Sequence, residues 1–224
     1  MNGTERVLVV APHPDDEVLG AGGTMAAFAA AGADVRVVIM TKAGPPRFPA
    51  ALGEAGIREA KQAHALLGVK ETVTLDLPIA ELDTLPHADV NARLGEVFAR
   101  IAPTHVFLPF GGDLMEDHQR VSLSALVCSR PLGADAPVGV YAYETLSQTN
   151  WNAPYAPRFA PTAFVDVSEH LESKIEAMAQ FESQLRPFPH ERSLEAIRAL
   201  ATLRGAQHGC VAAEAFVTIR QRLG

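Results

Sequence analysis

The sequence predicts an α/β fold, a mainly parallel sheet flanked by helices on both faces. The first observation is an alternation along the chain: short runs rich in β-branched residues are separated by longer segments of helical period, rich in Ala, Leu and Glu. This βαβα order favours parallel strands that are connected by helices. The second observation is size and composition. A chain of 224 residues, 48% hydrophobic and 20% charged, fits one domain spanning residues 1–224 and can bury a core of good size.

Six short runs are predicted as strands, beginning with VLVVA; they are residues 7–11, 35–40, 72–77, 105–109, 138–143 and 163–167. Seven segments of helical period are predicted as helices: residues 18–31, 51–67, 88–101, 118–130, 169–184, 191–204 and 212–222. Two Pro-rich loops stand out, residues 43–50 and 145–161, and the second contains Trp151. A long ordered loop in a compact domain is often a lid or a subunit contact.

Charge and cysteine content argue against several classes of protein. A net charge of −7 disfavours binding to nucleic acid or to an anionic membrane, because both need a basic field. Two cysteines, Cys128 and Cys210, are too few for a disulfide scaffold and fit a reducing compartment. The first residues show no signal-peptide pattern, and residues 18–33 are too weakly apolar to span a bilayer. We therefore expect a soluble cytoplasmic protein.

The first motif, PHPDDE at residues 12–17, directly follows the first predicted strand. Pro14 disfavours the helical region for His13, so the next helix begins at the acidic residues. Three adjacent carboxylates repel one another, and a helix N-terminus, a basic side chain or a metal ion would offset that repulsion. His13 and Asp16 are three residues apart across a strand-to-helix turn, which can aim both side chains at one point. Asp15 lies between them and must point elsewhere.

Two alternatives to a metal site compete at this motif. A well-capped helix next to a solvated histidine accounts for any one of these residues, but not for the whole constellation at a strand end. A dinucleotide-binding loop at residues 20–23 is disfavoured, because the glycines follow the acidic residues and lack the required spacing. The carboxylates would also repel a pyrophosphate.

A third metal ligand is predicted after the fourth strand, in FLPFGGDLMEDHQRV, where His118 opens a helix. If the strand order reverses beside the first strand, the carboxyl ends of the first and fourth strands are neighbours. His118 then converges on His13 and Asp16. Structural or surface roles are favoured for four other histidines, whereas two in turns remain candidates for the site; the six are His64, His87, His105 and His170, and His190 and His208.

At this point the sequence resembles the PIG-L/LmbE-like family of zinc-dependent de-N-acetylases. APHPDDEVLGAGGTMA resembles the family's first motif and DLMEDH its second. Further similar blocks lie at residues 58–69, 143–145, 164–178 and 204–216. The resemblance implies a Rossmann-like α/β sandwich, and hydrolysis of N-acetyl groups from N-acetylglucosamine-containing substrates. It also implies a small-molecule amino-sugar substrate and, from the habit of the family, a homo-oligomer.

Carried over by position, the resemblance makes His13, Asp16 and His118 the metal ligands and Asp15 the general base. Zn²⁺ is the implied cofactor, and two imidazoles with one carboxylate would also accept Fe²⁺ or Co²⁺. Zinc held in this way lowers the pKa of a bound water to about 7. Asp15 would take a proton from that water as it attacks the acetamide.

One departure from the family pattern is Met115, which stands where many relatives have a second histidine of the DLMEDH motif. Methionine can neither carry a proton nor donate a hydrogen bond, and losing one oxyanion donor costs about 10²–10³ in rate. One branch of the family has Asn in this motif. We hypothesise that another residue supplies the hydrogen bond or the proton, with His190 as the first candidate and His208 as the second. A loop histidine without a role is the alternative for His190.

Other side chains are candidates for supporting roles. Asp117 and Asp113 would orient a metal ligand or its neighbours, although helix capping and local turn formation explain them as well. Arg58, Arg130 and Tyr143 are candidates for substrate binding, with helix-end and surface roles as the alternatives for the arginines.

The leading functional hypothesis is therefore a metal-dependent hydrolase that removes acetyl from an amino sugar or its conjugate. Met115 makes a different reaction of activated water, such as that of an amidase or a hydratase, the main alternative. A binding protein that keeps the metal without turnover is a third class.

Overall fold

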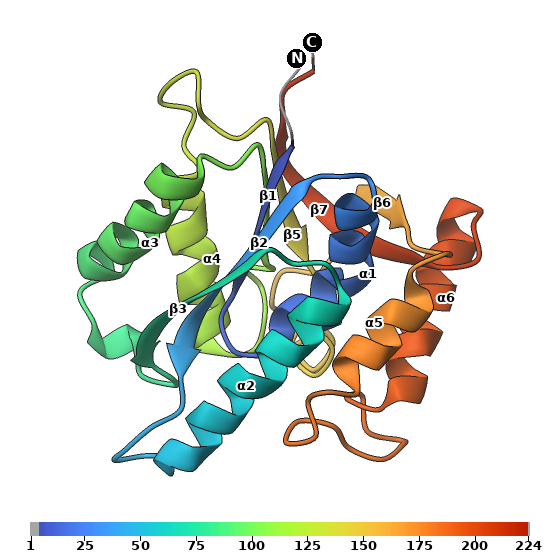
Figure 1. The fold of residues 1–224 in the computed structure, drawn as a ribbon, viewed down its shortest axis with the longest axis horizontal. Helices are drawn as coiled ribbons and strands as arrows, with labels where there is room; N and C mark the ends of the chain where they lie inside the picture. The colour runs from blue at the N-terminus through green and yellow to red at the C-terminus, as the bar shows by residue number, and fades with distance from the viewer. Residues whose placement is uncertain (1–4, 224) are drawn as a thin grey trace.

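The computed structural model describes residues 5–223, which form one seven-stranded sheet with helices on both faces (Figure 1). The strands are β1 (Arg6–Ala11), β2 (Asp34–Lys42), β3 (Glu71–Pro78), β4 (His105–Pro109), β5 (Gly139–Tyr143), β6 (Ala163–Asp166) and β7 (Ala213–Gln221). The helices are α1 (Asp16–Ala30), α2 (Ala50–Leu66), α3 (His87–Ile101), α4 (Glu116–Cys128), α5 (Leu171–Met178) and α6 (Leu194–His208), with a short 3₁₀ turn, η1 (Leu82–Thr84). The predicted fold class is confirmed.

The strand order is β3-β2-β1-β4-β5-β7-β6, and the first five strands in this order run parallel. β7 pairs antiparallel with both β5 and β6, so the sheet is mixed at one end. The prediction of a helix at 212–222 is wrong, because these residues form β7. The run from Phe216 to Ile219 is aromatic and β-branched, which suits a strand, and β7 gains hydrogen-bonded partners on both sides.

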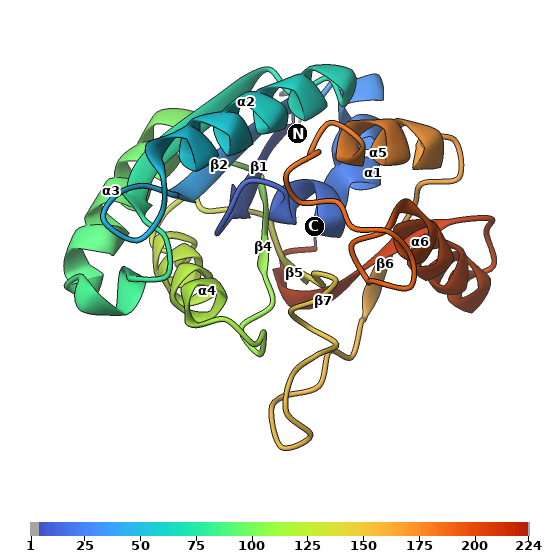
Figure 2. The same cartoon turned by 90° about the horizontal axis from the view of Figure 1, so that it is seen from below.

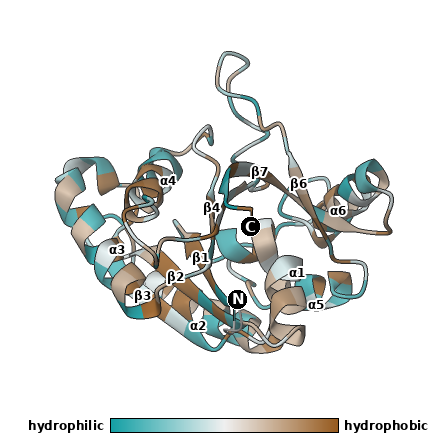
Figure 3. Ribbon diagram, turned by 90° about the horizontal axis from the view of Figure 1, so that it is seen from above, coloured by the Kyte–Doolittle hydropathy of each residue, from teal (hydrophilic) through white to brown (hydrophobic). Residues whose placement is uncertain are grey.

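Two hydrophobic clusters lie on opposite faces of the sheet. Along β1, Val7 and Val9 face the cluster under α1, α2, α5 and α6, whereas Leu8 and Val10 face the cluster under α3 and α4. The view from below shows the two groups of helices on either side of the strands (Figure 2). The middle parts of β1 and β2, which are covered on both faces, are apolar, as their brown colour shows (Figure 3).

β1 lies between β2 and β4, so the strand order reverses at β1, the arrangement in which His118 is expected to meet His13 and Asp16. Val7 pairs with His105 and Val9 with Phe107, which places the carboxyl ends of β1 and β4 next to each other. Ligand sites in open α/β sheets lie outside the carboxyl ends of the strands at such a reversal. The loops that leave β1 and β4 therefore meet where a site is expected.

The loop between β5 and β6 projects from the body of the molecule (Figures 2 and 3). Trp151 in this loop is half exposed and Tyr155 almost fully exposed. Among the helices formed by residues 5–223, none has the length and apolar character needed to cross a membrane.

Candidate active site

The turn after β1 has an unusual backbone. Asp15, the residue before α1, has φ 122° and ψ −30°, a conformation that side-chain-bearing residues rarely adopt. Two hydrogen bonds hold the turn: the His13 N–H donates to Asp16 Oδ2 at 2.9 Å, and the Asp15 N–H donates to Glu17 Oε2 at 3.2 Å. The acidic residues thus fix the strained backbone that places their own side chains.

His13, Asp16 and His118 converge on one point. His13 Nδ1 lies 3.1 Å from Asp16 Oδ2, and His118 Nε2 lies 3.2 Å from the same oxygen. One ligand atom from each of the three residues lies within 4.8 Å of the other two, and all three side chains are buried. The structure therefore brings together residues from the ends of β1 and β4 that are about a hundred positions apart in the chain.

Each imidazole is held by a second carboxylate through its other ring nitrogen. His13 Nε2–H donates to Asp117 Oδ2 at 2.9 Å, and His118 Nδ1–H donates to Asp113 Oδ2 at 2.8 Å. Asp117 also accepts the Ala80 N–H, and Asp113 accepts the Thr149 hydroxyl. The two histidines consequently present Nδ1 and Nε2, respectively, toward Asp16, an arrangement typical of metal-binding histidines.

The donor set fits a divalent cation. His118 Nε2 and Asp16 Oδ1 are buried and have no hydrogen-bond partner in the described part of the chain. Buried polar atoms without a partner are costly, and a metal ion would satisfy both. Two imidazole nitrogens and one carboxylate oxygen suit zinc, and also Fe²⁺ or Co²⁺. Three protein ligands leave a coordination position open, as in catalytic sites.

The pKa values of His118 and Asp16 reflect how closely imidazoles and carboxylates are packed in this cluster. Burial alone would lower the pKa of His118, but Asp16 and Asp113 outweigh it and raise that pKa to about 10. Burial would likewise raise the pKa of Asp16, but the neighbouring His118 and His13 hold it well below its usual value. A site that favours protonated imidazoles this strongly also attracts a cation, for the same electrostatic reason.

Asp15 stands beside this cluster and is not one of its ligands. Its side chain is buried, and Oδ2 has no hydrogen-bond partner within residues 5–223. Burial, reinforced by the adjacent Asp16, raises the pKa of Asp15 to about 8. A carboxylate with a pKa of about 8 and an oxygen that accepts no hydrogen bond can accept a proton and later return it.

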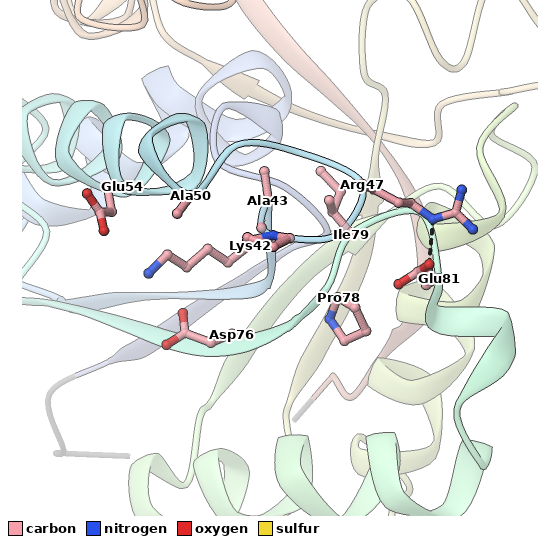
Figure 4. Close-up of a pocket in the computed structure, with 11 residues that line it drawn as sticks. Lys42, Ala43, Arg47, Ala50, Glu54, Asp76, Pro78, Ile79 and Glu81 are labelled. Atoms are coloured by element: carbon pink, nitrogen blue, oxygen red, sulfur yellow. Dashed lines mark hydrogen bonds and ion pairs between the residues drawn. The ribbon is translucent and has the colours of Figure 1, made fainter.

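Asp15 faces a cavity of about 230 Å³. The residues that line it are His13, Pro14, Asp15, Ala43, Phe48, Leu52, Gly53, Gly56, Ile79, Met115, Gln184 and Arg192. A second cavity of about 300 Å³ shares Ala43 and Ile79 with the first (Figure 4). In it, the Lys42 side chain extends between Glu54 on α2 and Asp76 on β3.

The model of the PIG-L family, described as GlcNAc-PI de-N-acetylase, matches residues 8–128, more than half of the chain and both halves of the metal cluster. The chain belongs to the PIG-L family. Members of this family are de-N-acetylases, so the predicted resemblance is confirmed.

Individual proteins are also similar to this chain over most of its length. Diacetylchitobiose deacetylase from Thermococcus kodakarensis is 28% identical over 211 residues, 85% of this chain and 73% of that protein. The conserved protein TT1542 from Thermus thermophilus has a TM-score of 0.78 at 27% identity and covers 99% of this chain and 97% of its own. The 4-carboxy-2-hydroxymuconate hydratase GalB from Pseudomonas putida shares the fold with a TM-score of 0.80 at 22% identity, covering 99% and 98%.

The structure places the three candidate substrate-binding residues away from the cavity beside Asp15. Tyr143 is fully buried and its hydroxyl donates to the Val10 carbonyl at 2.8 Å, which corrects the expectation that it meets substrate. Arg130 is exposed beyond the end of α4, where it donates to the Val127 carbonyl at 3.0 Å. Arg58 is exposed on α2 and lines a separate surface hollow.

The histidines proposed to replace the missing donor also lie outside the cavity lining. His208 is exposed near the end of α6, stacked on Phe164. The His190 ring packs edge-on against Trp151, and its Nδ1 accepts the Arg192 N–H at 3.0 Å. Met115 does line the cavity. The expectation that a histidine fills the role of the missing donor is therefore unsupported by the positions of His190 and His208.

Two features of the site were not anticipated from the sequence. Arg192 and Gln184 come from the segment between α5 and α6 and line the cavity. Glu17 is fully buried and accepts a hydrogen bond from His64 Nε2–H at 2.9 Å. This histidine on α2 therefore helps to fix the last residue of the PHPDDE motif. The PHPDDE motif itself hinted at a role for Glu17, whereas no local pattern distinguishes Arg192 from a surface arginine.

Proposed function

We propose that this protein hydrolyses the N-acetyl group of an amino sugar or of a conjugate of one. His13, Asp16 and His118 would hold a zinc ion, and Asp15 would be the general base. The observation that carries the proposal is the position of Asp15. It is a buried carboxylate with a pKa of about 8 whose Oδ2 accepts no hydrogen bond within residues 5–223, beside a fitting metal cluster and facing a cavity.

When bound, a divalent cation would polarise the acetamide carbonyl and favour ionisation of water. Asp15 accepts a proton from the water whose oxygen bonds to the carbonyl carbon. The carbon–nitrogen bond then breaks, the nitrogen takes the proton back from Asp15, and acetate and the free amine leave. Asp113 and Asp117 keep the two imidazoles oriented throughout.

The relatives and the shape of the site support the proposed substrate class. The similar protein from Thermococcus kodakarensis is named for deacetylation of diacetylchitobiose, an amino-sugar conjugate. In this chain the second cavity adjoins the first, and Lys42, Glu54 and Asp76 give it charges of both signs (Figure 4). We propose that it receives the group attached to the amino sugar. The cytoplasmic location, the single domain and the homo-oligomer stay predictions.

A second candidate is a hydratase that adds water to a carbon–carbon double bond. Met115 in the cavity, instead of a residue that can donate a proton, favours it, and the hydratase GalB shows that the fold accommodates such a reaction. Free amine and acetate distinguish the two functions, because a hydratase releases neither.

The test is release of acetate from N-acetylglucosamine, diacetylchitobiose and an N-acetylglucosaminyl-inositol, with zinc-loaded and chelator-treated protein. We expect release from at least one conjugate in the zinc form. Asp15→Asn should lower kcat by about 10²–10⁴ without loss of bound zinc. Asp135→Asn, in an exposed loop, is the matched control and should leave kcat unchanged. Zinc-loaded protein that releases no acetate from any acetamide would contradict the proposal.

A further inference from the structure

The proposed reaction develops negative charge on the acetamide oxygen, and such charge is normally met by a hydrogen-bond donor placed in advance. The cavity beside Asp15 has few such donors. Among its twelve lining residues, most side chains are apolar, and those that can donate are His13, Gln184 and Arg192. Both ring nitrogens of His13 already face carboxylates, those of Asp16 and Asp117.

Gln184 carries no charge, and one of its two amide N–H groups is engaged. Its Oε1 accepts from Arg192 Nη1 at 3.0 Å, and its Nε2 donates to Ser183 Oγ at 3.1 Å. The guanidinium of Arg192 is therefore the one cationic donor that remains among the side chains lining this cavity.

Arg192 is held rigidly for such a role. Nε donates to Ser147 Oγ at 2.8 Å, and Nη1 reaches both Gln184 Oε1 and, at 3.5 Å, Asp15 Oδ2. These partners come from the loop after β5, the segment after α5 and the turn after β1. About a fifth of the side chain is exposed. A guanidinium fixed from three segments needs little reorganisation when charge appears next to it.

We propose that Arg192 is a catalytic residue that donates a hydrogen bond to the carbonyl oxygen of the substrate and stabilises the oxyanion of the tetrahedral intermediate. It thereby takes the role of the hydrogen-bond donor that many relatives have at the position of Met115. This inference rests on the proposed hydrolysis. Because a guanidinium does not lose its proton in proteins, Arg192 stabilises charge without acting as an acid. Asp15 must then carry the proton from the attacking water to the departing nitrogen.

The test uses the zinc-loaded full chain and two variants, Arg192→Gln and Arg192→Lys. We expect Arg192→Gln to lower kcat by about 10²–10³, with KM changed less than about threefold. Arg192→Lys keeps the charge but loses the planar fork, so we expect an intermediate loss. Arg198→Gln is the control, since the side chain of that arginine on α6 is 43% exposed and pairs with Glu172. The double variant Met115→His/Arg192→Gln should recover part of the lost kcat.

A second measurement separates the oxyanion role from a general effect on the site. Binding of a methylphosphonamide analogue of the tetrahedral intermediate is measured by calorimetry, alongside zinc content and melting temperature. We expect Arg192→Gln to weaken binding of the analogue by about the factor lost in kcat, with binding of the free amine product unchanged. Unaltered affinity for the analogue would overturn the proposal, even if kcat fell, because Arg192 would then only position Asp15.

Failure of the inference and failure of the proposed function give different results. If wild-type protein binds the analogue but cleaves no acetamide, the proposed hydrolysis is refuted. If the Arg192→Gln variant then binds the analogue more weakly than the wild type does, the donor role of Arg192 is still supported. Active wild type whose Arg192→Gln variant retains kcat refutes the donor role alone. Wild type that neither cleaves nor binds the analogue refutes both. Equal weakening of substrate, product and analogue binding makes Arg192 a substrate anchor and also overturns the inference.

Discussion

The carboxylate of Asp117 holds the His13 ring by the nitrogen that faces away from the ligand cluster, with 2.9 Å between Nε2 and Oδ2. Asp117 is itself fixed by the Ala80 N–H at 2.6 Å, so a loop after β3 contributes to the orientation of a residue after β1. Asp113 repeats the arrangement at His118. The geometry of the cluster thus depends on two carboxylates that are not ligands.

The first prediction concerns metal affinity. Asp117→Asn should weaken zinc binding by about 10- to 100-fold, because the amide is a poorer acceptor for the His13 N–H and leaves that ring less basic and less well oriented. Zinc affinity is measured by competition with a chromogenic chelator. Glu116→Gln is the control, since Glu116 is exposed on the same helix turn and pairs with Arg120. Equal affinities of the wild type and Asp117→Asn would show that the contact does not tune the metal.

The second prediction concerns the glycines of the first motif. A Cβ on Gly20 would lie 2.2 Å from Cδ2 of the buried Tyr143 ring, whereas a Cβ on Gly95 in α3 meets nothing within 4 Å. Gly20→Ala should therefore lower the free energy of unfolding by about 1–3 kcal/mol through overpacking. Gly95→Ala should raise it by about 0.5–1 kcal/mol through helix propensity. Urea denaturation measures both, and a stable Gly20→Ala variant would mean that Tyr143 can move aside.

Much of the fold and the core of the site could be predicted because their signals are local. The apolar runs and helical periods identify six strands and six helices, and His13 and His118 each follow a strand directly. Parallel strands bring their carboxyl ends to one edge of a sheet, so topology alone makes these residues converge.

The features that were not predicted depend on long-range packing, which local sequence patterns do not indicate. β7 begins with the helix formers Ala213, Glu214 and Ala215 before its β-branched run, and it forms a strand because β5 and β6 offer it partners. Tyr143 ends a strand at the expected rim, yet its ring packs against Gly20 and its hydroxyl bonds to Val10. Arg192 reaches Asp15 across 177 positions of the chain, 192 minus 15, and only the fold brings the two together.

The third prediction concerns Glu17, whose buried carboxylate accepts the Asp15 N–H and His64 Nε2–H. Glu17→Gln replaces two hydrogen bonds to a carboxylate by weaker ones to a neutral amide, and the His64 ring must change tautomer, donating to Thr72 instead, to accept the amide NH₂. We expect the free energy of unfolding to fall by about 1–3 kcal/mol. The kcat should also fall, because the strained backbone of Asp15 loses its support.

Chemical denaturation and acetate release measure these two effects of Glu17→Gln. The matched control is Glu182→Gln, in an exposed turn after α5, which should change neither quantity. If Glu17→Gln kept the stability of the wild type and lost only kcat, the hydrogen bonds of Glu17 would serve the geometry of the site and not the fold.

The last prediction concerns the metal-free protein and pH. In the folded chain the pKa of His118 rises from its ordinary 6.5 to about 10, because Asp16 and Asp113 outweigh the effect of burial. A raised folded pKa stabilises the fold fully below the unfolded value, and this stabilisation is lost as pH rises through the folded value. The melting temperature of chelator-treated protein should therefore decline between about pH 6.5 and 10.

Zinc replaces the proton on the imidazole, so the melting temperature of the zinc-loaded protein should decline less over this range. Asp113→Asn, which removes one of the two carboxylates, should also flatten the profile of the metal-free protein. Identical pH profiles for the metal-free wild type and Asp113→Asn would mean that Asp113 does not raise the pKa of His118.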